Sequence, residues 1–139
     1  KQTLFENVLH ALKEDSHLLF TDLVYATKYA SDEPAVLEWC DSEPHLPDCW
    51  TVEQYKETLG ELGFTIRDVE DDSDTYRKLI SGKWVDFVES LSSRKLDRHF
   101  VNTMINEAQR WQLRRKALKS GHLRHVRVHA YRDLDKNIK

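Results

Sequence analysis

An aspartate near the end of an apolar run is a candidate residue for chemistry. Residues 18–24 read LLFTDLV, in which only Thr21 and Asp22 are polar. A run that is apolar in both alternating sets of positions is typical of a strand whose two faces are covered by helices. Ligands of open α/β sheets bind outside the carboxyl ends of such strands. Asp22 is therefore a candidate contact for a substrate amine, and the alternative is a carboxylate that caps the backbone amides of the following segment.

Aromatic side chains are frequent in the segment that follows this run. Cation–π attraction could let such rings hold a cationic amine. The alternative is that they pack the segment onto the core, which we favour for the tryptophans. Together with Asp22, the predicted substrate-binding residues are Tyr25, Tyr29, Trp39 and Trp50.

Histidines and cysteines do not form a recognisable metal site. Cys40 and Cys49 are not a CxxC pair and cannot make a zinc site alone, so we expect reduced thiols, with a disulfide as the alternative. No carboxylate lies at metal-ligand spacing from the histidines near the C-terminus, and we therefore predict no metal. Nor do the residues show a Ser/His/Asp or Cys/His pattern, so the catalytic residues stay unknown. The histidines considered are His99, His122, His125 and His129.

Charge is unevenly distributed along the 139 residues, whose net charge is -3. Residues 31–75 hold fourteen acids and two basic residues, whereas residues 108–132 hold eight Lys/Arg and no acid. The two segments could complement each other within the fold or mark a partner surface. No run of aromatic residues alternates with the basic ones, so we do not expect a nucleic-acid partner. No apolar run is long enough to span a membrane, and we expect a cytoplasmic protein without a membrane partner.

Hydrophobic periodicity divides the chain into alternating helices and strands. It predicts helices at residues 3–13, 51–62, 75–91 and 97–119, and strands at 17–24, 64–70 and 123–132. The predicted parts of this single partial domain are 1–25 (helix and strand), 26–50 (a lid), 51–74 (helix and strand), 75–120 (a helical insertion) and 121–133 (the final strand). We expect the lid, with its three prolines, to contain at most a short helix near residues 35–39.

Two segments together resemble the C-terminal half of a class I S-adenosylmethionine-dependent methyltransferase. The first is LKEDS followed by LLFTDLV, which is similar to the family's LKPGG turn and its fifth strand, although the proline and the glycines are replaced. The second is VEQYKETLGELGF, residues 52–64, which is similar to the helix before the family's sixth strand. The resemblance covers nearly the whole chain and implies an α/β fold: the C-terminal part of a Rossmann-like sheet. Its three strands would include an antiparallel last strand between the other two, with an inserted helix pair.

The same resemblance implies a function. The chain would be the substrate-binding C-terminal half of a methyltransferase acting on a small molecule, with S-adenosylmethionine bound by an N-terminal half. That half would carry the glycine-rich loop and the acid for the ribose, and this chain has only four isolated glycines and no GxG. We therefore expect the chain alone to be inactive and not to bind the cofactor tightly. The alternative is a non-catalytic interaction or regulatory module with a methyltransferase-like fold.

The first predicted strand has no obvious neighbour on one side. Without upstream strands it would lie at a sheet edge, where unpaired backbone groups are a template for another chain. We therefore expect a homodimer through this edge, burying the strand around Leu18, Phe20 and Leu23.

Overall fold

Three strands form one sheet in which the last strand of the chain lies in the middle. The computed structural model describes residues 1–132 and contains β1 (His17–Tyr25), β2 (Phe64–Asp71) and β3 (Leu123–Arg132) in the order β1-β3-β2. β3 pairs antiparallel with both neighbours, and its pairing with β1 runs from His17 opposite Tyr131 to Tyr25 opposite Leu123. The predicted insertion of an antiparallel final strand between its two predecessors is confirmed.

Helices begin and end close to the positions that the sequence indicates. α3 begins after Thr51, whose side chain accepts a bond from the Gln54 N–H while the Gln54 side chain accepts one from the Thr51 N–H. These reciprocal bonds form a capping box, whose Thr and Gln spacing can be read from the sequence. Gly121 ends α5 in the left-handed region at φ 81°, which only glycine adopts without strain. The helices are α1 (Gln2–Ala11), η1 (Ala30–Asp32), α2 (Pro34–Ser42), α3 (Val52–Glu61), α4 (Ser73–Leu91) and α5 (Arg98–Ser120).

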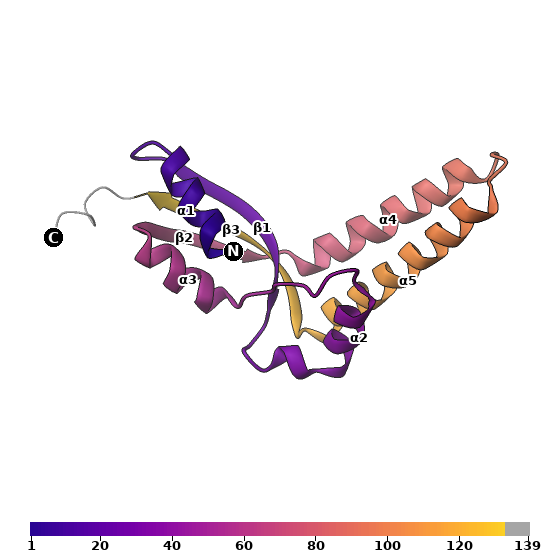
Figure 1. Cartoon of the computed structure of the whole chain (residues 1–139), viewed down its shortest axis with the longest axis horizontal. Coiled ribbons are helices and arrows are strands. Elements are labelled where there is room, and N and C mark those ends of the chain that lie inside the picture. The colour runs from indigo at the N-terminus through magenta and orange to yellow at the C-terminus, as the bar shows by residue number, and fades with distance from the viewer. Residues whose placement is uncertain (133–139) are drawn as a thin grey trace.

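The main core lies between one face of the sheet and the helices α1 and α3 (Figure 1). Period-two alternation turns the apolar side chains of the strands toward these helices. The buried members of this core are Phe5, Val24, Tyr55, Leu59, Phe64, Val126, Val128 and Ala130. A second, smaller core covers the opposite face only near the end of β1, where α2 and the base of α5 pack together.

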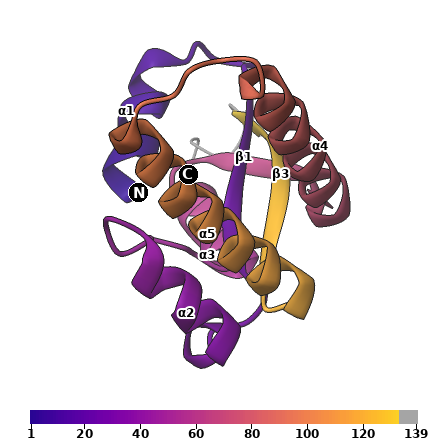
Figure 2. The same ribbon diagram turned by 90° about the vertical axis from the view of Figure 1, so that its right-hand side faces the viewer.

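The predicted lid at residues 26–50 contains a packed helix. α2 contributes Val36, Trp39 and Cys40 to the second core, where they contact Leu118 and Leu123. Figure 2 shows α2 beside the lower part of α5. The tryptophan of this helix packs the segment to the core, as the alternative interpretation held.

One face of β1 is less covered than the sequence suggested. Leu19 is 63% exposed, whereas Leu18 and Phe20 pack against the main core. The expectation that helices cover both faces along the whole strand is wrong. The reason is that α1 and α3 lie on the same face, while α4 and α5 extend away from the sheet.

α4 and α5 form a hairpin that projects beyond the body of the molecule (Figure 1). No residue of α4 is buried, and only Ala117 and Leu118 are buried in α5. The helical period of residues 97–119 predicts that Val101 and Ile105 point inward, but this prediction is wrong, because they are 36% and 50% exposed. Two helices expose wider apolar stripes than each can cover on the other.

The acidic and basic segments pair with each other inside the fold. Ion pairs join Arg114 to Glu43 and Lys116 to Glu38, between α5 and the region of α2. A third pair joins Arg127 of β3 to Glu70 of β2. The interpretation that the two segments complement each other within the fold is confirmed.

Truncation of the main core should destabilise the chain strongly. Leu59 has no exposed surface, so Leu59→Ala should lower the free energy of unfolding by about 2–5 kcal/mol, as measured by urea denaturation. The matched control is Leu46→Ala, because Leu46 is 83% exposed and its truncation should change the stability by less than about 0.5 kcal/mol. Equal effects of the two substitutions would contradict this assignment of the core.

We propose that a chain limited to these residues forms a two-fold dimer through the free edge of β1, which has no second neighbour among residues 1–132. Leu19 is the exposed apolar side chain of this strand, and Leu19→Lys should shift sedimentation toward the monomer because it places a charge in the interface. Leu46→Lys, which lies outside the strands, should leave the association unchanged. A wild-type monomer at micromolar concentration would contradict the proposal.

Candidate functional site

Two hollows, of about 530 Å³ and about 260 Å³, lie where β1 and β2 end and β3 begins, and together they are called the cleft. Asp71 and Arg124 line both hollows, and their side chains approach to 3.7 Å between Nε and Oδ2. Tyr25 lines the smaller hollow, and Arg77 and Lys119 line the larger one. The cleft therefore offers groups of both charges and one aromatic ring to a small polar molecule.

Asp22 lies next to this cleft on the face covered by α1 and α3. Its carboxylate accepts hydrogen bonds from the Tyr55 hydroxyl, the Lys1 ammonium and, at 2.9 Å, the Leu23 N–H. The Lys1 ammonium also donates to the Tyr55 hydroxyl at 2.9 Å. Asp22 is thus held by three internal donors, and the one backbone amide among them belongs to Leu23 of β1 itself, not to the following segment.

Burial raises the pKa of the Tyr55 phenol well above its usual range, and the hydrogen bond and charge of Asp22 raise it further. Tyr55 therefore stays protonated and remains a donor to the carboxylate. Burial also raises the pKa of the neighbouring Cys49 thiol to about 12, so this thiol is a weak nucleophile. Cys40 and Cys49 are both free thiols, as expected.

The four predicted aromatic residues do not form one pocket. Trp39 is 2% exposed, and its indole N–H donates to Glu43 at 2.6 Å. Trp50 packs against Tyr55 at 5.1 Å between ring centroids, and Tyr29 is largely exposed beneath Lys28. Of the five predicted residues, only Tyr25 lines a hollow of the cleft. The assignment of all five to a substrate stays a prediction.

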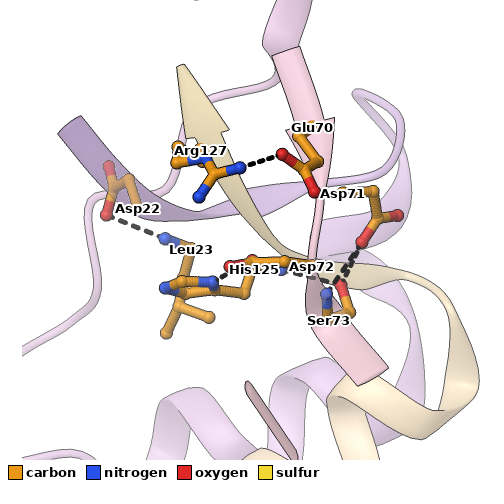
Figure 3. Close-up of polar contacts among 8 residues, drawn as sticks. All are labelled: Asp22, Leu23, Glu70, Asp71, Asp72, Ser73, His125 and Arg127. Atoms are coloured by element: carbon orange, nitrogen blue, oxygen red, sulfur yellow. Dashed lines mark hydrogen bonds and ion pairs between the residues drawn. The ribbon is translucent and has the colours of Figure 1, made fainter. Parts of the chain in front are cut away.

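Asp72 and His125, each next in sequence to residues that line the hollows, form a pair that the sequence did not reveal (Figure 3). Asp72 precedes α4, and its carboxylate contacts Nδ1 of His125. The Ser73 hydroxyl accepts the His125 backbone N–H at 2.9 Å, and the Tyr76 ring stacks on the imidazole at 4.0 Å. In the tautomer that donates Nδ1–H to Asp72, Nε2 is left as an acceptor.

The same contacts also attach the base of α4 to β3. The Asp72 N–H donates to the His125 carbonyl at 3.1 Å, so backbone and side chains act together. The two residues are 53 positions apart. The register of β2 on β3, which places Asp71 opposite Val126, is the signal that could have revealed the pair.

Comparisons with known proteins find the same fold in larger enzymes. No protein-family model matches the chain, and no curated protein matches it in sequence. Among solved structures, 94% of the chain superposes on 49% of the cyclopropane synthase MmaA2 from Mycobacterium tuberculosis, with a TM-score of 0.77 and 13% identity. It likewise superposes, over 96% of its length, on 30% of the phosphoethanolamine N-methyltransferase 2 of Haemonchus contortus, with a TM-score of 0.70 and 14% identity.

A third match is an S-adenosylmethionine-dependent methyltransferase from Thiobacillus denitrificans, bound to S-adenosylhomocysteine. It has a TM-score of 0.60 and 12% identity over 94% of this chain and 51% of that one. The chain has the fold of part of an S-adenosylmethionine-dependent methyltransferase. It spans about half the length, or less, of these three structures.

In this methyltransferase-like fold the histidines have separate partners. His125 contacts Asp72, His129 lies 2.9 Å from His17, and His122 lies 3.6 Å from Glu33. Within residues 1–132, no group of three or more His, Cys, Asp or Glu side chains is placed to hold a metal ion. In the same range, no helix is both long and apolar enough to cross a membrane.

Stability should fall at alkaline pH because the pKa of Cys49 is raised in the fold. A raised pKa adds stability that is present below the unfolded-state pKa of about 8.5 and is lost as pH rises toward the folded value of about 12. The free energy of unfolding from urea denaturation should therefore decrease between about pH 8.5 and pH 11. Cys49→Ala should make this decrease shallower, and an unchanged slope would contradict the burial of the thiol.

Proposed function

We propose that this chain is the substrate-binding half of an S-adenosylmethionine-dependent methyltransferase that acts on a small molecule. The observation that carries the proposal is the superposition of 94–96% of the chain on enzymes of this type. The cleft at the ends of β1 and β2 supports it, because ligands of α/β sheets bind at that end of the strands.

The chain's own residues do not fit the cofactor. Close approach to S-adenosylmethionine requires a glycine-rich turn after a strand, and none of the glycines stands in such a turn. Gly60 and Gly82 lie within α3 and α4, and Gly63 and Gly121 follow α3 and α5. Cofactor binding is therefore assigned to another half of the enzyme.

This chain contributes the positioning of the methyl acceptor and the exclusion of water from it. A methyl group on a sulfonium is already activated, so the enzyme mainly aligns the acceptor and shields it. The cleft can hold a small polar acceptor by its charged groups, Asp71 and Arg124, and by the ring of Tyr25. Asp22, held by Tyr55 and the Leu23 N–H, fixes the end of β1 behind this ring.

The first test is calorimetric titration of the isolated chain with S-adenosylmethionine. We expect no micromolar binding, because the glycine-rich turn and the ribose-binding acid are absent from the sequence. The intact mass of the natural protein then shows whether a cofactor-binding half is attached. Micromolar affinity of the isolated chain for S-adenosylmethionine would contradict the assignment of cofactor binding to another half of the enzyme.

The second part of the test uses the natural protein, with a tritiated methyl donor and a fractionated metabolite extract. We expect a labelled small molecule, and Tyr25→Ala should raise KM about tenfold through loss of the ring contact. Leu46→Ala is the matched control and should leave KM unchanged. A natural protein that begins near residue 1 and transfers no methyl group would favour the alternative, a non-catalytic interaction or regulatory module.

A further inference from the structure

The α4/α5 hairpin exposes a continuous apolar surface that nothing in the described part of the chain covers. Two hollows of about 440 and 380 Å³ lie along it, and both are lined by Trp84, Phe87 and Met104. Leu79, Val88 and Ile105 are 57%, 50% and 50% exposed. Apolar patches of this kind on a soluble protein mark interaction surfaces.

The hairpin has an excess of positive charge, which favours an anionic partner. Residues 73–120 contain eleven Lys/Arg and five Asp/Glu. Five of these cations form ion pairs within residues 1–132, and the other six have no acidic partner there: Lys78, Arg94, Lys95, Arg98, Arg115 and Lys119. Arg94, Lys95 and Arg98 lie at the exposed tip beside Leu96, which is also exposed.

We propose that the hairpin binds the surface of an anionic lipid bilayer, with its apolar groove against the acyl region and its free cations among the headgroups. Amphipathic helices with aromatic and aliphatic residues on one side and Lys/Arg around them bind such interfaces without spanning them. This departs from the sequence-based expectation of no membrane partner, which rested on the lack of a membrane-spanning run.

Two other occupants fit the hairpin less well. A second copy of the hairpin would bring six unpaired cations against six more, which opposes association. A cofactor-binding half that continues the sheet would pair with β1, whereas α4 leaves from β2 at the opposite edge. The lipid proposal does not depend on the methyltransferase proposal, because it concerns a different surface and a different measurement.

Sedimentation with sucrose-loaded vesicles tests the proposal. The full chain should bind vesicles of phosphatidylcholine with 30% phosphatidylglycerol, at 0.1 M salt, at least about tenfold more tightly than pure phosphatidylcholine vesicles, and 0.5 M salt should weaken the binding. Each cation near such a surface contributes about fivefold, so Arg94→Glu with Lys95→Glu should reduce binding at least about tenfold. Val88→Ser with Ile105→Ser should also reduce it, with the fold checked by circular dichroism.

The matched control carries Lys13→Glu and Leu46→Ser, which change an exposed cation and an exposed leucine away from the hairpin. Its binding should equal that of the wild type. The proposal is overturned if the chain ignores vesicles, or if neutral and anionic vesicles bind it equally. It is also overturned if the control loses as much binding as the hairpin variants. A dimer that Val88→Ser with Ile105→Ser dissociates would identify a second copy as the occupant instead.

Discussion

The structure depends on the pairing of β3 with two strands that come much earlier in the chain. β1 and β2 do not touch each other, and each is held in the sheet only by its hydrogen bonds to β3. Val126, Val128 and Ala130 of this strand also supply the centre of the main core. Both the sheet and the core therefore form only when the last described segment of the chain has docked. Such long-range pairing makes folding slow, because the entropy cost of closing the long loop comes before the stabilising contacts form.

The placement of the helices on the sheet also explains which surfaces of the sheet are exposed. α1 and α3 both cover one face, so the opposite face is covered only near the cleft, where α2 and α5 meet. Farther along β1, His17, Leu19 and Thr21 are exposed. The edge of β1 has no second neighbour in the described residues, and the hairpin exposes its apolar stripe there. An additional strand that continues the sheet would pair with this edge of β1, whereas the described chain leaves it open.

Local features were predictable because they depend on neighbouring residues. The capping box of Thr51 and Gln54, the end of α5 at Gly121 and the alternation in β3 all follow from short sequence patterns. The exposure of Leu19 and Ile105 was not predictable. The spacing of apolar residues shows which face of a helix or strand is apolar, but not whether another element covers that face. The contact between Asp72 and His125 was missed for a related reason: it depends on strand register, which connects residues far apart in the sequence.

Ion pairs join several elements of the fold in addition to its apolar cores. Most of the basic residues near the end of the chain face acids: Arg114 and Lys116 hold α2 on α5, and Arg127 joins β3 to β2. The Lys116–Glu38 and Arg127–Glu70 pairs are about half exposed, so they contribute little stability individually and act mainly on which surfaces meet. The Arg114–Glu43 pair is largely buried. The cations at the tip of the hairpin lie beyond the reach of these acids, because α4 and α5 carry them away from the sheet (Figure 1). The basic residues of the second half of the chain thus divide into a set that pairs with acids across the fold and a distal set without an acidic partner in residues 1–132.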